Sequence, residues 1–105
     1  MIKLSVLYPN GEGKKFDKEY YLNKHMPLSI KLQGSAIKSV TVETGISGGV
    51  PGSEPPFVVI CNFMYESMES FIEAFMPHAE VLMDDIKNYT DIGTVIQFSE
   101  VHVLQ

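Results

Sequence analysis

The sequence predicts an α+β fold, because strand-like and helix-like segments alternate in the order β-α-β-β-α-β. Turn residues separate the segments, and clusters of Pro and Gly at 9–13 and 45–56 end two of the strands. This order is that of a ferredoxin-like βαββαβ unit, a four-stranded antiparallel sheet with helices on one side. With 105 residues, the chain has room for one domain, which we place at 1–105.

Four strands are predicted over 2–8, 36–44, 57–65 and about 94–104. The third and fourth carry apolar residues on both of their alternating faces, which indicates that both faces of the sheet are buried. A chain of this length has no further element to cover the second face. A second copy is the simplest cover, so we expect a homodimer in which two sheets pack face to face as a dimeric α/β barrel.

The first helical segment is predicted from about residue 14 to a stop at Gly34. Pro27 lies inside it and removes a backbone donor, so we expect the helix to be kinked or split there. The face expected to be buried has the spacing i, i+4, i+7 and i+11 and consists of Tyr21, His25, Leu28 and Leu32.

The second helical region is predicted as two short helices between the last two strands. Ser67 is placed to cap the first, and Pro77 ends it. The second covers residues 79–86, and its apolar stripe leaves the acidic residues Asp84 and Asp85 facing outward.

Composition and charge exclude several classes of function. Eight Lys+Arg against thirteen Asp+Glu give a net charge of −5, which repels a nucleic-acid backbone. No apolar run approaches the length of a membrane span, and the first residues lack the order of a signal peptide, so we expect a cytoplasmic protein. Cys61 is the single cysteine and lies among apolar neighbours, which favours a core thiol over a nucleophile or a metal ligand.

Histidines are the first candidates for chemistry, because only histidine titrates near neutral pH without help. His25 follows Tyr21 by one helical turn, so an imidazole and a phenol share one face and could reach one ligand. His78 follows a proline at a sharp corner and is a second candidate. His102, in the last strand, is expected to be structural or to lie at the dimer surface. We therefore predict His25, Tyr21 and His78 as catalytic residues, with capping or core packing as the alternative for each.

Four further residues are predicted to bind a ligand. Tyr89 and Asp91 lie in the turn before the last strand, where a phenol and a carboxylate could orient an imidazole or simply pack and cap the turn. Met64 and Phe75 would contribute to an adaptable apolar wall, which suits an oily ligand and a protein core equally well. No metal-site spacing is present, so no metal is expected.

Several motifs together resemble the EthD family over nearly the whole chain. They are Phe16-Asp17, Tyr20-Tyr21, His25-Met26-Pro27-Leu28, the loop 48–52 and Asn88-Tyr89-Thr90-Asp91-Ile92. The resemblance implies a dimeric α/β barrel similar to muconolactone isomerases and small cofactor-independent monooxygenases. The family's namesake is associated with bacterial breakdown of ethyl tert-butyl ether alongside an oxygenase system.

Two functional hypotheses follow. In the first, the chain is a small oxidoreductase or isomerase that acts on a small apolar or aromatic metabolite by proton abstraction or cofactor-free oxygenation. His25 would be the base or acid, Tyr21 the orienting or oxyanion-stabilising hydroxyl, and His78 a second polar contact. In the second, it is an accessory protein that carries a hydrophobic intermediate for an oxygenase. No cofactor is expected, and haem held by one of the two histidines is a third alternative, since related barrels bind haem.

Overall fold

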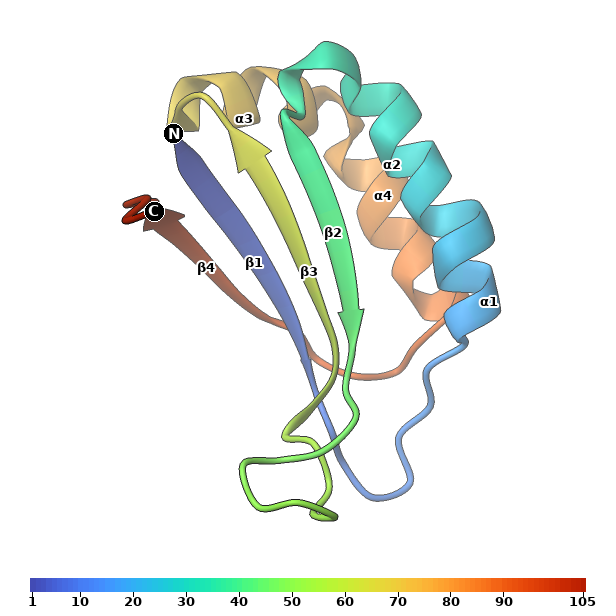
Figure 1. Cartoon of the computed structure of the whole chain (residues 1–105). Coiled ribbons are helices and arrows are strands. Elements are labelled where there is room, and N and C mark those ends of the chain that lie inside the picture. Colours follow the sequence, from blue (N-terminus) through green and yellow to red (C-terminus); the bar gives the residue numbers. More distant parts are fainter.

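A computed structural model describes all residues 1–105 and contains one four-stranded antiparallel sheet (Figure 1). The strand order is β2-β3-β1-β4, so β1 and β3 are the central strands. This arrangement confirms the predicted α+β class and its four-stranded antiparallel sheet. The strands are β1 Ile2–Pro9, β2 Ser39–Thr44, β3 Phe57–Tyr65 and β4 Val95–Glu100.

All helices lie on one face of the sheet and leave the other face open (Figure 1). The first helical unit contains α1, a π-helical turn and α2, and Gly34 ends it with a φ of 64°. The second unit contains α3 and α4, joined by a short 3-10 turn. No helix in the structure has both the length and the apolar character that a bilayer span needs. The helices are α1 Lys18–Tyr20, α2 Met26–Gln33, α3 Met68–Phe75 and α4 Ala79–Asp85.

Side-chain caps fix where both units begin. The carboxylate of Asp17 accepts a hydrogen bond from the backbone N–H of Tyr20 at 3.1 Å. The hydroxyl of Ser67 accepts one from the N–H of Ser70, also at 3.1 Å, which confirms the predicted cap. Each cap satisfies a backbone donor that has no partner within the helix.

Pro27 accounts for the irregularity in the first helical unit. Its ring has no N–H and would crowd the preceding turn of a regular α-helix. The residues before it, Tyr21–His25, form a wider π-helical turn, in which the N–H of Met26 donates to the carbonyl of Tyr21. This turn confirms the expected break in the helix near the proline.

The π turn also corrects the predicted buried face. A π turn contains about one residue more than an α turn, so the face that follows it moves on by one position. Tyr21 and His25 are buried as predicted, but the next buried side chains are Ser29 and Gln33. Leu28 and Leu32, predicted for that face, are only half-buried.

The core lies between the sheet and the helices and is rich in aromatic side chains. Cys61 is completely buried in it, as expected for a core thiol. The core residues are Leu4, Tyr8, Tyr21, Met26, Val59, Cys61, Phe63, Tyr65, Tyr89 and Ile92.

On the open face, β3 is half-buried and carries a polar centre that the strand pattern did not reveal. Asn62 is buried and accepts a hydrogen bond from Ser5 at 3.3 Å. Its amide donates to Thr41 at 3.3 Å and to Glu43 at 3.1 Å, on the neighbouring strand. Its strand neighbours Val58, Ile60 and Met64 are half-buried.

The predicted last strand is too long, because β4 ends at Glu100 rather than near residue 104. Glu100 pairs with Ile2, where β1 begins, so no strand lies beside the residues that follow. One more backbone bond forms, from the N–H of Val101 to the carbonyl of Met1 at 3.2 Å. The predicted start of β2 at residue 36 is also early, since 34–36 form a 3-10 turn.

Candidate functional site

A cavity of about 300 Å³ lies between the sheet and the two helical units. This volume is at the lower end of the range for ligand pockets. Fourteen of its 18 lining residues are hydrophobic, so a ligand that fills it must be small and largely apolar. The apolar wall includes Leu4 and Phe63 from the sheet, Phe71 and Phe75 from α3, and Leu82 from α4.

His25 borders this cavity and is oriented by a carboxylate. Its Nδ1 lies 2.9 Å from Oδ2 of Asp85, at the end of α4. Only a protonated Nδ1 donates to a carboxylate, so the neutral ring carries its proton there and leaves Nε2 as an acceptor. Nε2 has no hydrogen-bond partner within the chain. Every fully buried side-chain nitrogen or oxygen in the structure has such a partner, so Nε2 is not fully buried and is accessible.

Asp85 is itself held by two further donors. Its Oδ1 accepts hydrogen bonds from the hydroxyl of Tyr20 at 2.6 Å and from the amide of Asn88 at 2.8 Å. Burial acts to raise the pKa of Asp85, but the hydrogen bonds from Tyr20, Asn88 and His25 outweigh it, and the pKa lies below its ordinary value. Asp85 is therefore an ionised carboxylate at neutral pH, with its orientation fixed towards the imidazole.

Tyrosine side chains surround the imidazole. The ring of Tyr21 is stacked on that of His25 with centroids 5.7 Å apart, and the ring of Tyr89 lies 4.7 Å away. The hydroxyls of Tyr8 and Tyr89 are 2.8 Å apart and share one hydrogen bond. Burial raises the pKa of Tyr8, Tyr21 and Tyr89, so all three keep their protons at neutral pH. The Tyr8–Tyr89 pair thus retains one proton that it can donate to a ligand oxygen.

A second set of polar side chains lines the cavity farther along α2. Ser29 and Gln33 line the cavity wall one and two turns beyond His25. The amide of Gln33 donates to the hydroxyl of Ser29 at 3.0 Å, and the hydroxyl of Tyr65 donates to the amide oxygen of Gln33 at 2.5 Å. The cavity therefore has two polar regions in an otherwise apolar wall.

The family model for the EthD domain matches residues 10–93, which include the π turn, His25 and Asp85. The chain belongs to the EthD family. A crystal structure of an EthD-like protein from Ralstonia eutropha is 44% identical, with a TM-score of 0.93 over 99% of this chain and 94% of that chain. An EthD family protein from Bacillus halodurans is 26% identical, with a TM-score of 0.74 over 97% of this chain and 99% of that one.

A protein from Arabidopsis thaliana shares the fold alone. It is 16% identical, with a TM-score of 0.62 over 100% of this chain and 99% of that chain. A comparison with curated proteins found no match.

Four of the predicted site residues of this EthD domain meet at the apolar cavity: His25, Tyr21, Tyr89 and Phe75. Met64 does not, because strand alternation directs its neighbours Phe63 and Tyr65 to the helix side and Met64 to the open face. The catalytic and binding roles of the four remain predictions.

His78 and Asp91 also lie away from the cavity. His78 is partly exposed at the corner between α3 and α4 and is not among the lining residues. Asp91 is exposed and accepts a hydrogen bond from the backbone N–H of Lys15 at 2.9 Å, which pins the loop before α1. Its carboxylate makes this loop contact and does not orient His25.

The carboxylate that orients His25 is Asp85, and here the prediction was wrong. Asp85 was expected to face outward, but its side chain is only 15% exposed. It is 60 residues from His25 in the sequence, so no local spacing could have paired them. Among the side chains of this EthD domain, no group of three or more His, Cys, Asp or Glu is placed to hold a metal ion.

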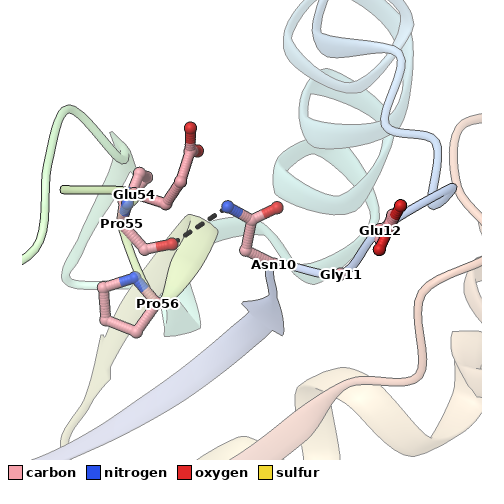
Figure 2. A pocket seen from close by; sticks show the side chains of 6 residues that line it. All are labelled: Asn10, Gly11, Glu12, Glu54, Pro55 and Pro56. Carbon is pink, nitrogen blue, oxygen red and sulfur yellow. Dashed lines mark hydrogen bonds between the residues drawn. The ribbon is translucent and has the colours of Figure 1, made fainter.

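A second hollow lies at the other end of the sheet, between residues 10–12 and 54–56 (Figure 2). It is open to solvent and is lined by only six residues, of which three are Asn10, Glu12 and Glu54. The amide of Asn10 donates to the carbonyl of Pro55 at 3.0 Å, and Glu12 and Glu54 lie on either side of Asn10 without converging. This hollow is a contact between two loops, and the apolar cavity is the better candidate for function.

Proposed function

We propose that this EthD domain is an enzyme that uses His25 as a general base on a small apolar or aromatic molecule. The observation that carries the proposal is the 2.9 Å contact between Nδ1 of His25 and Asp85 at the edge of an apolar cavity. A fixed imidazole with an accessible Nε2 is the arrangement that general base catalysis requires. Desolvation in the cavity would strengthen its interaction with a developing charge.

The proposed reaction begins with proton transfer. Nε2 of His25 takes a proton from a weakly acidic C–H or O–H of the ligand, and the electron pair of that bond stays on the ligand as an enolate or phenolate. Asp85 stabilises the imidazolium that forms, and the Tyr8–Tyr89 pair donates a hydrogen bond to the oxyanion. Return of the proton to another carbon completes an isomerisation. Cofactor-free oxygenation would use the same anion with dioxygen as co-reactant.

The experiment compares deuterium exchange into the C–H bonds of a panel of carbon acids by wild-type protein and His25→Gln. We expect wild-type protein to accelerate exchange with at least one β-diketone or lactone in the panel. His25→Gln should lose that acceleration by about a hundredfold or more, because general base catalysis contributes on that order. Equal exchange by the two proteins would remove His25 from the reaction. Circular dichroism of both proteins checks that the variant is folded.

The apolar wall also favours a second candidate function, that of an accessory protein that binds a hydrophobic intermediate for an oxygenase. Hydrophobic residues dominate the lining, and burial of an apolar ligand needs no chemistry from His25. Saturable binding without exchange on any member of the panel, with equal affinity in His25→Gln, would favour this role.

We also propose that the functional unit is a homodimer joined through the open face of the sheet. The support is that Val58, Ile60 and Met64 remain only half-buried there, and Val95 of β4 is 52% exposed. Packing of two such faces would remove this apolar surface from water. Sedimentation equilibrium tests the proposal, and a monomer at micromolar concentration would refute it.

A further inference from the structure

The second polar region of the cavity is a directed chain of hydrogen bonds that runs from the sheet to the cavity wall. It begins at Tyr65 on β3 and passes through Gln33 to Ser29 on α2. Tyr65, Gln33 and Ser29 are 0%, 7% and 4% exposed, so all three polar groups are withdrawn from water. Burial of polar groups costs free energy unless every donor and acceptor finds a partner.

The direction of the chain is set by the amide of Gln33, whose oxygen lies against Tyr65 and whose nitrogen lies against Ser29. The hydroxyl of Tyr65 donates a hydrogen bond to the amide oxygen of Gln33. Burial of the Tyr65 side chain raises the pKa of this hydroxyl, so Tyr65 keeps its proton. The amide nitrogen of Gln33 is therefore turned towards Ser29 and donates to its oxygen. Ser29 accepts this bond, and no group of the chain accepts the proton of its hydroxyl.

The hydroxyl of Ser29, whose proton has no acceptor within the chain, belongs to a residue of the cavity wall. Ser29 lines the apolar cavity, four residues and one helical turn after His25. Four residues rise by about 6 Å along the helix axis, so a single small molecule can contact both residues. The same cavity is also lined by apolar side chains such as Phe63, Met26 and Phe71.

We propose that Ser29, held by Gln33 and Tyr65, is a subsite that donates a hydrogen bond to a carbonyl oxygen of the ligand. This inference rests on the proposed function and names its substrate class. The ligand is a small ring compound that carries a ketone, lactone or quinone oxygen at the Ser29 end. Its acidic proton lies at the His25 end. A purely structural role for the three residues, as a tie between α2 and β3, is the alternative that the experiment must separate.

Two probes of nearly equal shape make that separation. The first is para-hydroxyacetophenone, which has a carbonyl group, and the second is para-ethylphenol, in which a methylene replaces it. Both are titrated into the full-length protein, and the side-chain amide signal of Gln33 and the backbone signals are followed by heteronuclear NMR. We expect the ketone to bind about three- to tenfold more tightly, the preference expected of one hydrogen bond in a desolvated site.

Variants assign the preference to the subsite. Ser29→Ala should bind both probes equally while its affinity for para-ethylphenol stays close to that of wild type. Tyr65→Phe should weaken the preference without touching the cavity wall, because it frees Gln33 to turn. Thr94→Val is the matched control, since Thr94 is another hydroxyl-bearing residue of the same wall outside the chain of bonds. This control should keep the full preference.

The possible results either support the subsite or overturn it. Equal binding of the two probes by wild-type protein, no binding of either, or a preference that survives Ser29→Ala would overturn it. A preference for the ketone that is lost only in Thr94→Val would also overturn the subsite. The proposed function fails separately, because it depends on the effect of His25→Gln on deuterium exchange and not on which probe binds more tightly.

Discussion

His25 and Asp85 are separated by 60 residues in the chain, yet Nδ1 of one lies 2.9 Å from Oδ2 of the other. This contact joins the π turn of the first helical unit to the end of α4 in the second. It is also the feature that distinguishes the cavity from an ordinary gap in a hydrophobic core, because it fixes an imidazole in the cavity wall.

Removal of the carboxylate should change the tautomer of His25. In wild-type protein the bond to Asp85 fixes the proton of the neutral ring on Nδ1. In Asp85→Asn the amide can donate as well as accept, so the proton should move towards Nε2. Long-range nitrogen–proton correlation spectra of the neutral imidazole report the tautomer directly. An unchanged Nδ1–H tautomer in the variant would contradict the orienting role.

The same carboxylate should contribute to stability with a defined pH dependence. Its pKa is lowered in the folded protein, so its contribution is fully present above the unfolded value, about 4. That contribution is lost as the pH falls through the folded value. The difference in free energy of unfolding between wild type and Asp85→Asn should be largest near pH 7 and should shrink below pH 4. Urea denaturation at both pH values measures it, and a constant difference would show that Asp85 is not responsible.

The hydroxyl pair of Tyr8 and Tyr89 should behave as a coupled unit. Tyr8→Phe leaves the hydroxyl of Tyr89 buried without its partner, and it should cost about 1 to 3 kcal/mol of stability. Tyr89→Phe should cost a similar amount. The double variant should cost less than the sum of the two, because it removes both polar groups together. Urea denaturation of the three variants completes the cycle, and strict additivity would argue against the bond.

Cys61 should be inert in the folded protein. The thiol is completely buried, and burial raises its pKa to about 11, so very little thiolate forms near neutral pH. A disulfide reagent at pH 8 should therefore label it only as fast as the protein unfolds, and labelling should become rapid in denaturant. Rapid labelling of the native protein would mean that this strand is locally open.

Local patterns predicted most of the fold and only half of the site. The run of mostly apolar and β-branched residues that follows Pro55 and Pro56 placed β3 at its observed bounds. The Tyr21–His25 spacing was correct because both residues lie within the first turns of the helix. The Met64 prediction contradicted alternation, since its neighbours Phe63 and Tyr65 belong to the other face.

The remaining site residues could not be predicted, because their contacts join parts of the chain that no local sequence pattern relates. Asp85 was assigned to solvent on helical periodicity, and its partner is supplied by a different helical unit. Tyr8 lies on the first strand and meets Tyr89 only after the sheet and helices have packed. Ser29 and Gln33 were hidden by the π turn, because a regular α-helical wheel directs the leucines beside them inward.

The π turn therefore decides more than the shape of the helix. With a regular helical repeat through residues 21–25, Leu28 and Leu32 would face the sheet, and α2 would add only hydrocarbon side chains to the cavity wall. With one residue added to the turn, Ser29 and Gln33 face the sheet instead. The proposed capacity of this cavity to distinguish an oxygenated ring from a bare one would thus be encoded in backbone geometry, next to a proline, and not in the overall composition of the helix.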